Sequence, residues 1–138
     1  MIVAGLGFRA AVSEASLRAA LAGLPAHLPP AALATAADKA VTPALQALAQ
    51  DMGLPVIAIA AADLTAVQTP SQSRASLAAR GVGSVAEAAA LVAAAQGGTG
   101  GGTGGKQGQG AAVLLCPRVL SPDHMATAAL AQTQELAR

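Results

Sequence analysis

Alanine content is the feature that most limits what this chain can fold into. The 138 residues include 39 alanines, whereas only 35 residues belong to the larger apolar types. The core must therefore come from Val, Leu and Ile on short elements, with Ala filling the seams between them. A chain of this length is enough for one domain with a true core, without metals or disulfides. We expect a single domain over residues 1–138.

Composition excludes several classes of partner. With one Phe and no Trp or Tyr, the chain lacks the aromatic side chains on which single-stranded nucleic acid stacks. A net charge of +1 is too small for a protein that binds phosphate backbones. The best apolar run, Met52–Ala62, is shorter than the roughly 20 residues of a membrane span. We expect neither a nucleic acid nor a membrane as partner.

The few cysteine and histidine residues indicate no metal site. Cys116 is alone, which excludes an internal disulfide and fits a reducing cytoplasm. The apolar N-terminus is followed by Arg9 rather than preceded by a basic residue, so it is not a secretory signal. His27, His124 and Cys116 have no metal-ligand spacing, and both histidines are expected at the surface. We predict a cytoplasmic protein without a metal or cofactor.

Strands and helices alternate along the predicted chain, which is typical of an α/β sheet covered on both faces. Ligands of such folds bind at the carboxyl ends of the strands. The predicted strands are Met1–Phe8, Ala31–Ala36, Pro55–Ala60 and Ala112–Cys116, the last one ended by Pro117. The predicted helices are one capped by Ser13 and ending near Gly23, then Thr42–Met52, Arg74–Ala79 and Ser84–Ala95, with a helical turn at Asp63–Val67.

Two further segments are read from composition alone. Gly97–Gly110 holds nine glycines in fourteen residues, which predicts a flexible loop without a phosphate cradle. Met125–Arg138 is rich in Ala, Leu, Gln and Glu, and its intrinsic propensity favours a helix.

Three short motifs have both a functional and a structural interpretation. Residues 5–10 (GLGFRA) match the glycine fingerprint of dinucleotide-binding folds, but the acidic partner expected about 20 residues later is missing. We favour a tight loop whose amides approach a ligand, the alternative being a plain turn. Asp38 and Lys39, at a predicted strand end, are either site residues or a solvated pair. Ser84 and Glu87 form either a helix cap or a carboxylate-binding helix start.

The order of the motifs resembles a known family. The motifs are Gly5–Arg9 (GLGFR), Ala34–Lys39 (ATAADK), Leu48–Pro55 (LAQDMGLP), Asp63–Val67 (DLTAV), Gly83–Ala90 (GSVAEAAA), Leu114–Arg118 (LLCPR) and Ala126–Ala129 (ATAA). Together they resemble the family formed by CobE and the C-terminal domain of CbiG, in cobalamin (vitamin B12) biosynthesis. The resemblance implies a three-layer α/β/α sandwich with a mixed central sheet. It also implies a strand at Ala126–Ala131, against the helical propensity there.

The same resemblance implies a role in building the corrin ring. CbiG opens a ring lactone of a cobalt-precorrin and releases acetaldehyde, whereas CobE is a free-standing relative of the aerobic route. We expect no counterpart here of the N-terminal part of CbiG, so hydrolase activity is not carried over. The family often has Cys where this chain has Phe8, which excludes a thiol role at that position.

Corrin precursors carry acetate and propionate groups, which call for backbone N–H donors, a helix N-terminus and cations. The candidate ligand-binding residues are Gly5, Gly7, Arg9, Thr35, Asp38, Lys39, Ser71, Ser84, Glu87, Arg118 and Thr127, with Ser73 as a further hydroxyl. Phe8, Leu64 and Val67 are expected to form an apolar wall. Asp38 and Glu87 are the only carboxylates considered for acid/base work, and no catalytic residue is assigned.

Three functional hypotheses follow. The favoured one is a protein that binds a corrin-ring intermediate, as a carrier or as part of a precorrin-processing step, with other cobalamin-pathway enzymes as partners. The second is a hydrolase acting on a ring lactone. The third is a nucleotide-binding α/β module that uses residues 5–10.

Overall fold

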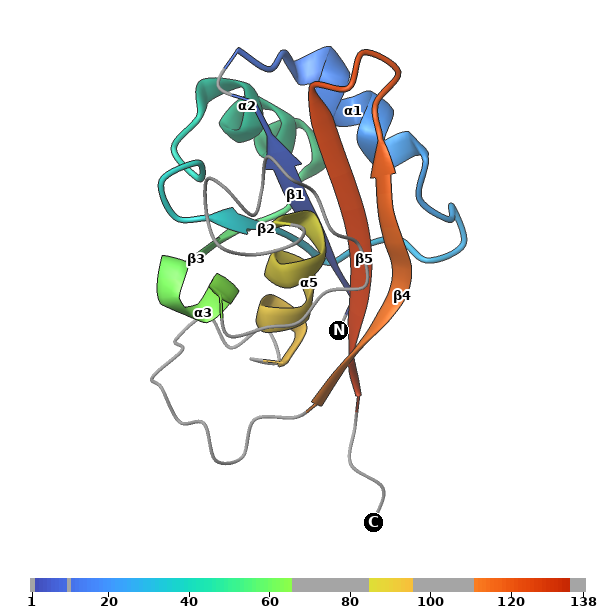
Figure 1. Ribbon diagram of the computed structural model, residues 1–138. Helices are drawn as coiled ribbons and strands as arrows, with labels where there is room; N and C mark the ends of the chain where they lie inside the picture. The colour runs from blue at the N-terminus through green and yellow to red at the C-terminus, as the bar shows by residue number, and fades with distance from the viewer. Residues whose placement is uncertain (1, 10, 66–84, 96–110, 135–138) are drawn as a thin grey trace.

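A five-stranded mixed sheet with helices on both faces forms the fold in the computed structural model (Figure 1). The structure describes residues 2–9, 11–65, 85–95 and 111–134. The elements are β1 (Ile2–Phe8), α1 (Glu14–Ala22), β2 (Ala32–Ala36), α2 (Pro43–Met52), β3 (Val56–Ile59), α3 (Ala61–Thr65), α5 (Val85–Ala95), β4 (Ala111–Leu120) and β5 (Ala126–Gln134). The predicted α/β class is confirmed.

The directions of the strands decide which strand ends lie at the same edge of the sheet. The order across the sheet is β3-β2-β1-β5-β4, with β1, β2 and β3 parallel to one another. Strand β5 is antiparallel to both β1 and β4. The carboxyl ends of β1 to β4 and the amino end of β5 therefore share one edge of the sheet. Helices α1 and α2 cover one face, and α3 and α5 cover the other (Figure 1).

The helix boundaries follow local signals that the sequence displays. The Ser13 hydroxyl accepts a hydrogen bond from the Ser16 amide at 3.1 Å, which caps α1 as predicted. Pro43 stands in the first turn of α2, where its missing N–H costs nothing. Gly53 ends that helix with a φ of 71°, a left-handed conformation that glycine adopts without strain. These boundaries are confirmed.

The predicted end of β4 at Pro117 is wrong, because the strand continues to Leu120. Strand β4 lies at the edge of the sheet, where a residue without an N–H is tolerated. The register with β5 also shifts twice, once between Leu114 and Cys116 and once between Cys116 and Val119. Pro117 lies in the second irregularity, so its missing N–H removes no regular ladder bond.

The prediction of a helix at the C-terminus, made from intrinsic propensity, is also wrong. The segment is strand β5, which runs between β1 and β4 and pairs with both. Its alanines at 126, 128, 129 and 131 are buried, so the pairing with two neighbours outweighs their helical propensity. The strand that the family resemblance implies at Ala126–Ala131 is confirmed and extends to Gln134.

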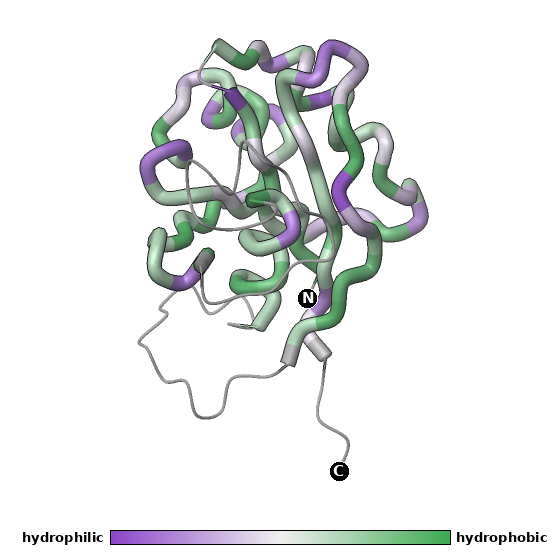
Figure 2. Tube along the Cα trace, viewed as in Figure 1, coloured by the Kyte–Doolittle hydropathy of each residue, from purple (hydrophilic) through white to green (hydrophobic). Residues whose placement is uncertain are grey.

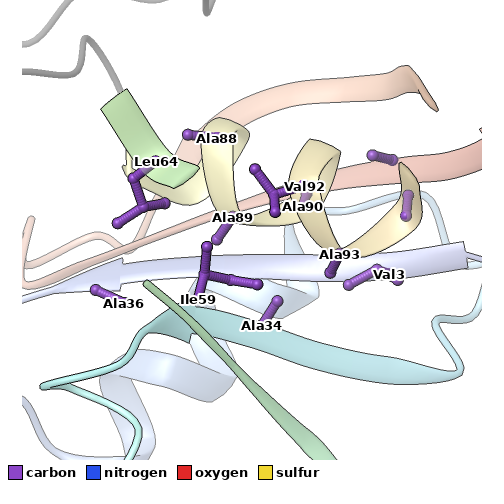
Figure 3. Packing of buried hydrophobic residues seen from close by; sticks show 12 residues of the cluster. Val3, Ala34, Ala36, Ile59, Leu64, Ala88, Ala89, Ala90, Val92 and Ala93 are labelled. Atoms are coloured by element: carbon purple, nitrogen blue, oxygen red, sulfur yellow. The ribbon is translucent and has the colours of Figure 1, made fainter. Parts of the chain in front are cut away.

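Two hydrophobic clusters lie on opposite faces of the sheet. The cluster under α5 consists mostly of alanines, and in Figure 3 the short side chains of Ala89 and Ala93 point from the helix toward the strands. A Cβ atom on Gly5 would lie 2.0 Å from the Ala86 carbonyl oxygen and 2.6 Å from the Ala90 nitrogen. Glycine is therefore required at position 5 for α5 to pack this closely on β1.

Hydropathy follows the same layering. In Figure 2 most of each strand is green or pale, and the purple stretches lie mainly in connecting turns and on helices. No helix in the described part of the chain is long and apolar enough to cross a membrane. The predicted helix Arg74–Ala79 and the glycine tract Gly97–Gly110 lie outside the described residues.

Candidate functional site

Five residues stand at the shared edge of the sheet, which we call the carboxyl rim. Phe8 ends β1 and Arg9 follows it, and Lys39 and Val41 follow β2. Thr127 stands near the start of β5, opposite Gly7 in the register with β1. Sequence reasoning placed Arg9, Lys39 and Thr127 in one site, and the parallel and antiparallel pairing brings them to one edge.

Lys39 is held by a compact turn that follows β2. Its amide donates to the Ala36 carbonyl at 2.9 Å, and its own carbonyl accepts from the Thr42 amide at 3.0 Å. The Gln46 side chain, from α2, donates to the Ala40 carbonyl in the same turn. The turn fixes the backbone, and the Lys39 ammonium lies 5.7 Å from the centre of the Phe8 ring. Such a distance is typical of a cation–π contact.

Arg9 is exposed and has a fixed backbone. Its amide donates to the Met125 carbonyl at 3.0 Å, and its carbonyl accepts from the Val12 amide at 3.0 Å. Among the described residues the salt bridges are those of Arg18, with Glu14 and with Asp51. The guanidinium of Arg9 and the ammonium of Lys39 therefore form no ion pair in this part of the chain.

The glycine motif is not the loop that the sequence predicts. Both Gly5 and Gly7 lie inside β1, and Gly5 pairs with Ala34 on one side and Ala129 on the other. A dinucleotide fingerprint needs its glycines in a loop after the strand, facing the ligand. Here α5 covers Gly5, so the glycine serves helix–sheet packing. The tight-loop prediction is wrong for this reason.

The two candidate threonines differ in what their hydroxyls do. Thr35 is fully buried, and its hydroxyl donates to the Leu6 carbonyl at 2.8 Å beyond the last register pair of β1 with β2. It stabilises the sheet and has no access to the rim. Thr127 is half-buried, and its hydroxyl donates to the Gly7 carbonyl at 3.2 Å. Of the two threonines, only Thr127 has a partly exposed side chain.

Glu87 is a buried carboxylate in the first turn of α5. It is 0% exposed, and its Oε2 atom accepts a hydrogen bond from the Arg118 amide at 2.8 Å. That amide lies in the irregular stretch of β4, between Cys116 and Val119, outside the regular ladder. Glu87 therefore satisfies a donor that the bulged strand leaves over, which is a structural role. Arg118 is half-buried beside the first turn of α5.

The remaining candidate residues of the site differ in how exposed their side chains are. Asp38 is exposed next to Lys39. The prediction that Leu64 forms part of the apolar wall is wrong, because its side chain is fully buried in the core beneath α5. Sequence reasoning missed Val41, which is 76% exposed and the most exposed large hydrophobic residue of the described chain. The one sequence feature that could have indicated Val41 is an apolar side chain between a predicted strand and a predicted helix. The candidates outside the described residues are Val67, Ser71, Ser73 and Ser84.

A second polar cluster fixes the turn between β4 and β5. Asp123 accepts hydrogen bonds from the hydroxyls of Ser121 and Ser16 and from the Met125 amide. These bonds, that of Ser121 first, lower the pKa of Asp123 from 3.8 to about 2. The cluster attaches the turn to α1. His27 and His124 are exposed, as predicted, and the described residues contain no group of three that could hold a metal.

Comparison with known proteins decides the family. The family model described as "Cobalamin synthesis G C-terminus" matches residues 2–131. The chain belongs to this CobE/CbiG C-terminal family. It is thus a cobalamin biosynthesis protein, as the ordered motifs predicted.

Two solved structures are similar to the chain over nearly its whole length. One is CobE, described as a protein from the cobalamin (vitamin B12) biosynthetic pathway, with 32% identity, a TM-score of 0.76, and coverage of 100% of this chain and 93% of CobE. The other is the cobalamin biosynthesis protein ChiG from Agrobacterium tumefaciens strain C58, with 28% identity, a TM-score of 0.66, and coverage of 98% and 100%. No match was found among curated proteins.

Proposed function

We propose that this protein binds a corrin-ring intermediate of cobalamin biosynthesis at the carboxyl rim, as a carrier or as part of a precorrin-processing step. One observation carries the proposal. Two cations, Arg9 and Lys39, stand without an ion pair in the described chain, next to its only aromatic residue, Phe8. The edge of the sheet that carries them is where ligands of open α/β folds bind.

The chemistry of the rim fits a macrocycle with acidic side groups. Arg9 and Lys39 offer charge-assisted hydrogen bonds to acetate or propionate carboxylates. Thr127 adds a hydroxyl, and Phe8 and Val41 add apolar surface. Val41 takes the place in the apolar wall that Leu64 does not fill, because Leu64 is in the core.

Binding is better supported than hydrolysis or nucleotide recognition. Glu87, one of two carboxylates considered for acid/base work, is buried and engaged by the Arg118 amide. The nucleotide hypothesis depends on a glycine loop, and Gly5 and Gly7 lie within β1 instead. The cations and the aromatic ring of the rim are suited to binding a ligand rather than to breaking a bond.

Titration with a coloured corrinoid acid tests the proposal. Purified protein is titrated with hydrogenobyrinic acid, a metal-free corrin polycarboxylate, and binding is followed by its visible absorbance. We expect Arg9→Ala and Lys39→Ala each to weaken binding about ten- to a hundredfold, since each loses a charge-assisted hydrogen bond. Arg18→Ala is the charge-matched control, because the Arg18 guanidinium on α1 is already paired with Glu14 and Asp51. Equal affinities for all three variants would contradict the assignment of the rim.

A separate assay addresses the hydrolase hypothesis. Incubation with a lactone-bearing cobalt-precorrin and measurement of released acetaldehyde distinguishes turnover from binding. We expect binding without acetaldehyde release by this chain alone.

A further inference from the structure

Phe8 is an isolated aromatic ring in an alanine-rich setting. The sequence has no other Phe, Tyr or Trp. The ring stands at the last position of β1, opposite Ala126 of β5, and it is half-buried against the cluster under α1 and α2. The ring is therefore anchored on its core side and only partly exposed.

The Lys39 ammonium lies over this ring, 5.7 Å from its centre. The turn hydrogen bonds of Lys39 and Ala40 fix the backbone, so only the flexible side chain can move. No carboxylate in the described part of the chain forms a salt bridge with Lys39. Within the described part of the chain, the contact with Phe8 is thus the interaction that holds the ammonium where it lies.

The two attractions open to Lys39 differ in strength. A cation–π contact at a partly exposed site is weaker than a hydrogen bond between an ammonium and a carboxylate in the same place. A ligand carboxylate at the rim would therefore draw the ammonium away from the ring. The ring face would then be free to contact an apolar or conjugated surface of the same ligand.

We infer that Lys39 is a displaceable cover on Phe8, which makes the rim selective for ligands that combine a conjugated face with a carboxylate at its edge. The inference rests on the proposed function and adds its specificity mechanism. A ligand with only the conjugated face must push the ammonium off the ring without compensation. A ligand with only a carboxylate leaves the ring unused.

A comparison of two probes tests this exchange. The probes are hydrogenobyrinic acid and its fully amidated derivative, which has the same ring without carboxylates. Lys39→Ala should weaken binding of the acid about tenfold or more. The same change should strengthen binding of the amide about two- to fivefold, because the cover is gone. In a Phe8→Leu background, Lys39→Ala should no longer strengthen binding of the amide, since the contact between Lys39 and the ring is already absent.

A second measurement does not depend on variants. Aromatic proton signals of the protein come from Phe8 and two histidines alone, so the Phe8 ring is identified directly. Bound acid should give nuclear Overhauser contacts between the Phe8 ring and the macrocycle. Far-UV circular dichroism confirms that each variant is folded, and Phe8→Met replaces Phe8→Leu if the latter is not.

The possible outcomes separate the two claims. Opposite effects of Lys39→Ala on the two probes, with Phe8 contacts, support the cover. Weaker binding of both probes, an unchanged amide affinity, or an absence of Phe8 contacts overturns the cover and leaves the proposed function standing. If the wild-type protein binds neither probe, both the cover and the proposed function are overturned.

Discussion

The two faces of the sheet are packed in different ways. The face under α1 and α2, here the leucine face, holds the fully buried leucines Leu6, Leu17, Leu33, Leu45, Leu48 and Leu130. The face under α5, here the alanine face, is built mainly from Ala34, Ala36, Ala88, Ala89, Ala90, Ala93, Ala94 and Ala131. On the first face, long side chains fill the space between layers. On the second, the helix backbone itself comes close to the strands.

The difference shows how an alanine-rich chain builds a core. Small side chains bury little apolar surface each, so their face is stabilised by close contact of many short groups. At Gly5 this face has no room for an added atom, because the nearest atoms belong to the backbone of α5. The leucine face has the opposite weakness, since removal of atoms leaves a cavity. Addition and removal of atoms therefore test the two faces separately.

The largest effect is expected from Gly5→Ala on the alanine face. The new Cβ would lie 2.0 Å from the Ala86 carbonyl oxygen, so α5 would have to shift. We expect a loss of at least about 3 kcal/mol in the free energy of unfolding, measured by urea denaturation. Gly7→Ala is the matched control, because its nearest neighbour is the Thr127 hydroxyl at 3.0 Å, and it should cost about 1 kcal/mol. Equal costs at both glycines would refute the close-packing account.

Shortening a buried side chain should cost more stability on the leucine face than on the alanine face. Leu48→Ala, at a fully buried position of the leucine face, should cost about 2–5 kcal/mol of stability because it creates a cavity. Ala90→Gly on the alanine face should cost about 1 kcal/mol, mostly through helix propensity. Thermal and urea unfolding of the two variants measure the difference. The comparison fails if Ala90→Gly is the more damaging change.

The two faces also attach the edge strand β4 differently. On the alanine face, buried Glu87 accepts the Arg118 amide, so Glu87→Ala leaves that donor without its carboxylate. We expect a loss of about 1–3 kcal/mol in the free energy of unfolding. Amide hydrogen exchange at Arg118 should rise in the variant, whereas exchange at Leu33 in β2 serves as the control. Unchanged exchange at Arg118 would show that the carboxylate does not hold the bulge.

The smallest effect is expected at the attachment on the leucine face, and it depends on pH. The pKa of Asp123 is lowered to about 2, so the carboxylate stabilises the folded chain above its ordinary pKa of 3.8. That stabilisation is lost as the pH falls from about 4 through 2. The melting temperatures of the wild type and Asp123→Asn should differ above pH 4 and converge near pH 2. A difference that stays constant over this range would assign no role to the charge.

Predictability differed between the local signals and the ligand-facing residues. Caps and stops such as Ser13, Pro43 and Gly53 act on neighbouring backbone, so their positions fixed the helices correctly. The grouping of Arg9, Lys39 and Thr127 was predicted from strand ends and from the family resemblance, and the strand order of the structure places all three at one edge of the sheet. Val41 could not be found this way, because exposure of an apolar residue depends on which other segments cover it.

By itself, the sequence determined the alternation of strands and helices, the α/β class and, through its ordered motifs, the family. Only the tertiary structure decided three further points. It carried the strand implied at Ala126–Ala131 on to Gln134, because β4 pairs with β5 as far as that residue. It carried β4 past Pro117, because an edge strand has no partner on its outer side. It placed Gly5 beneath α5 rather than in a loop, because the approach of two backbones depends on atoms 81 or more residues apart in the chain, those of Ala86 and Ala90.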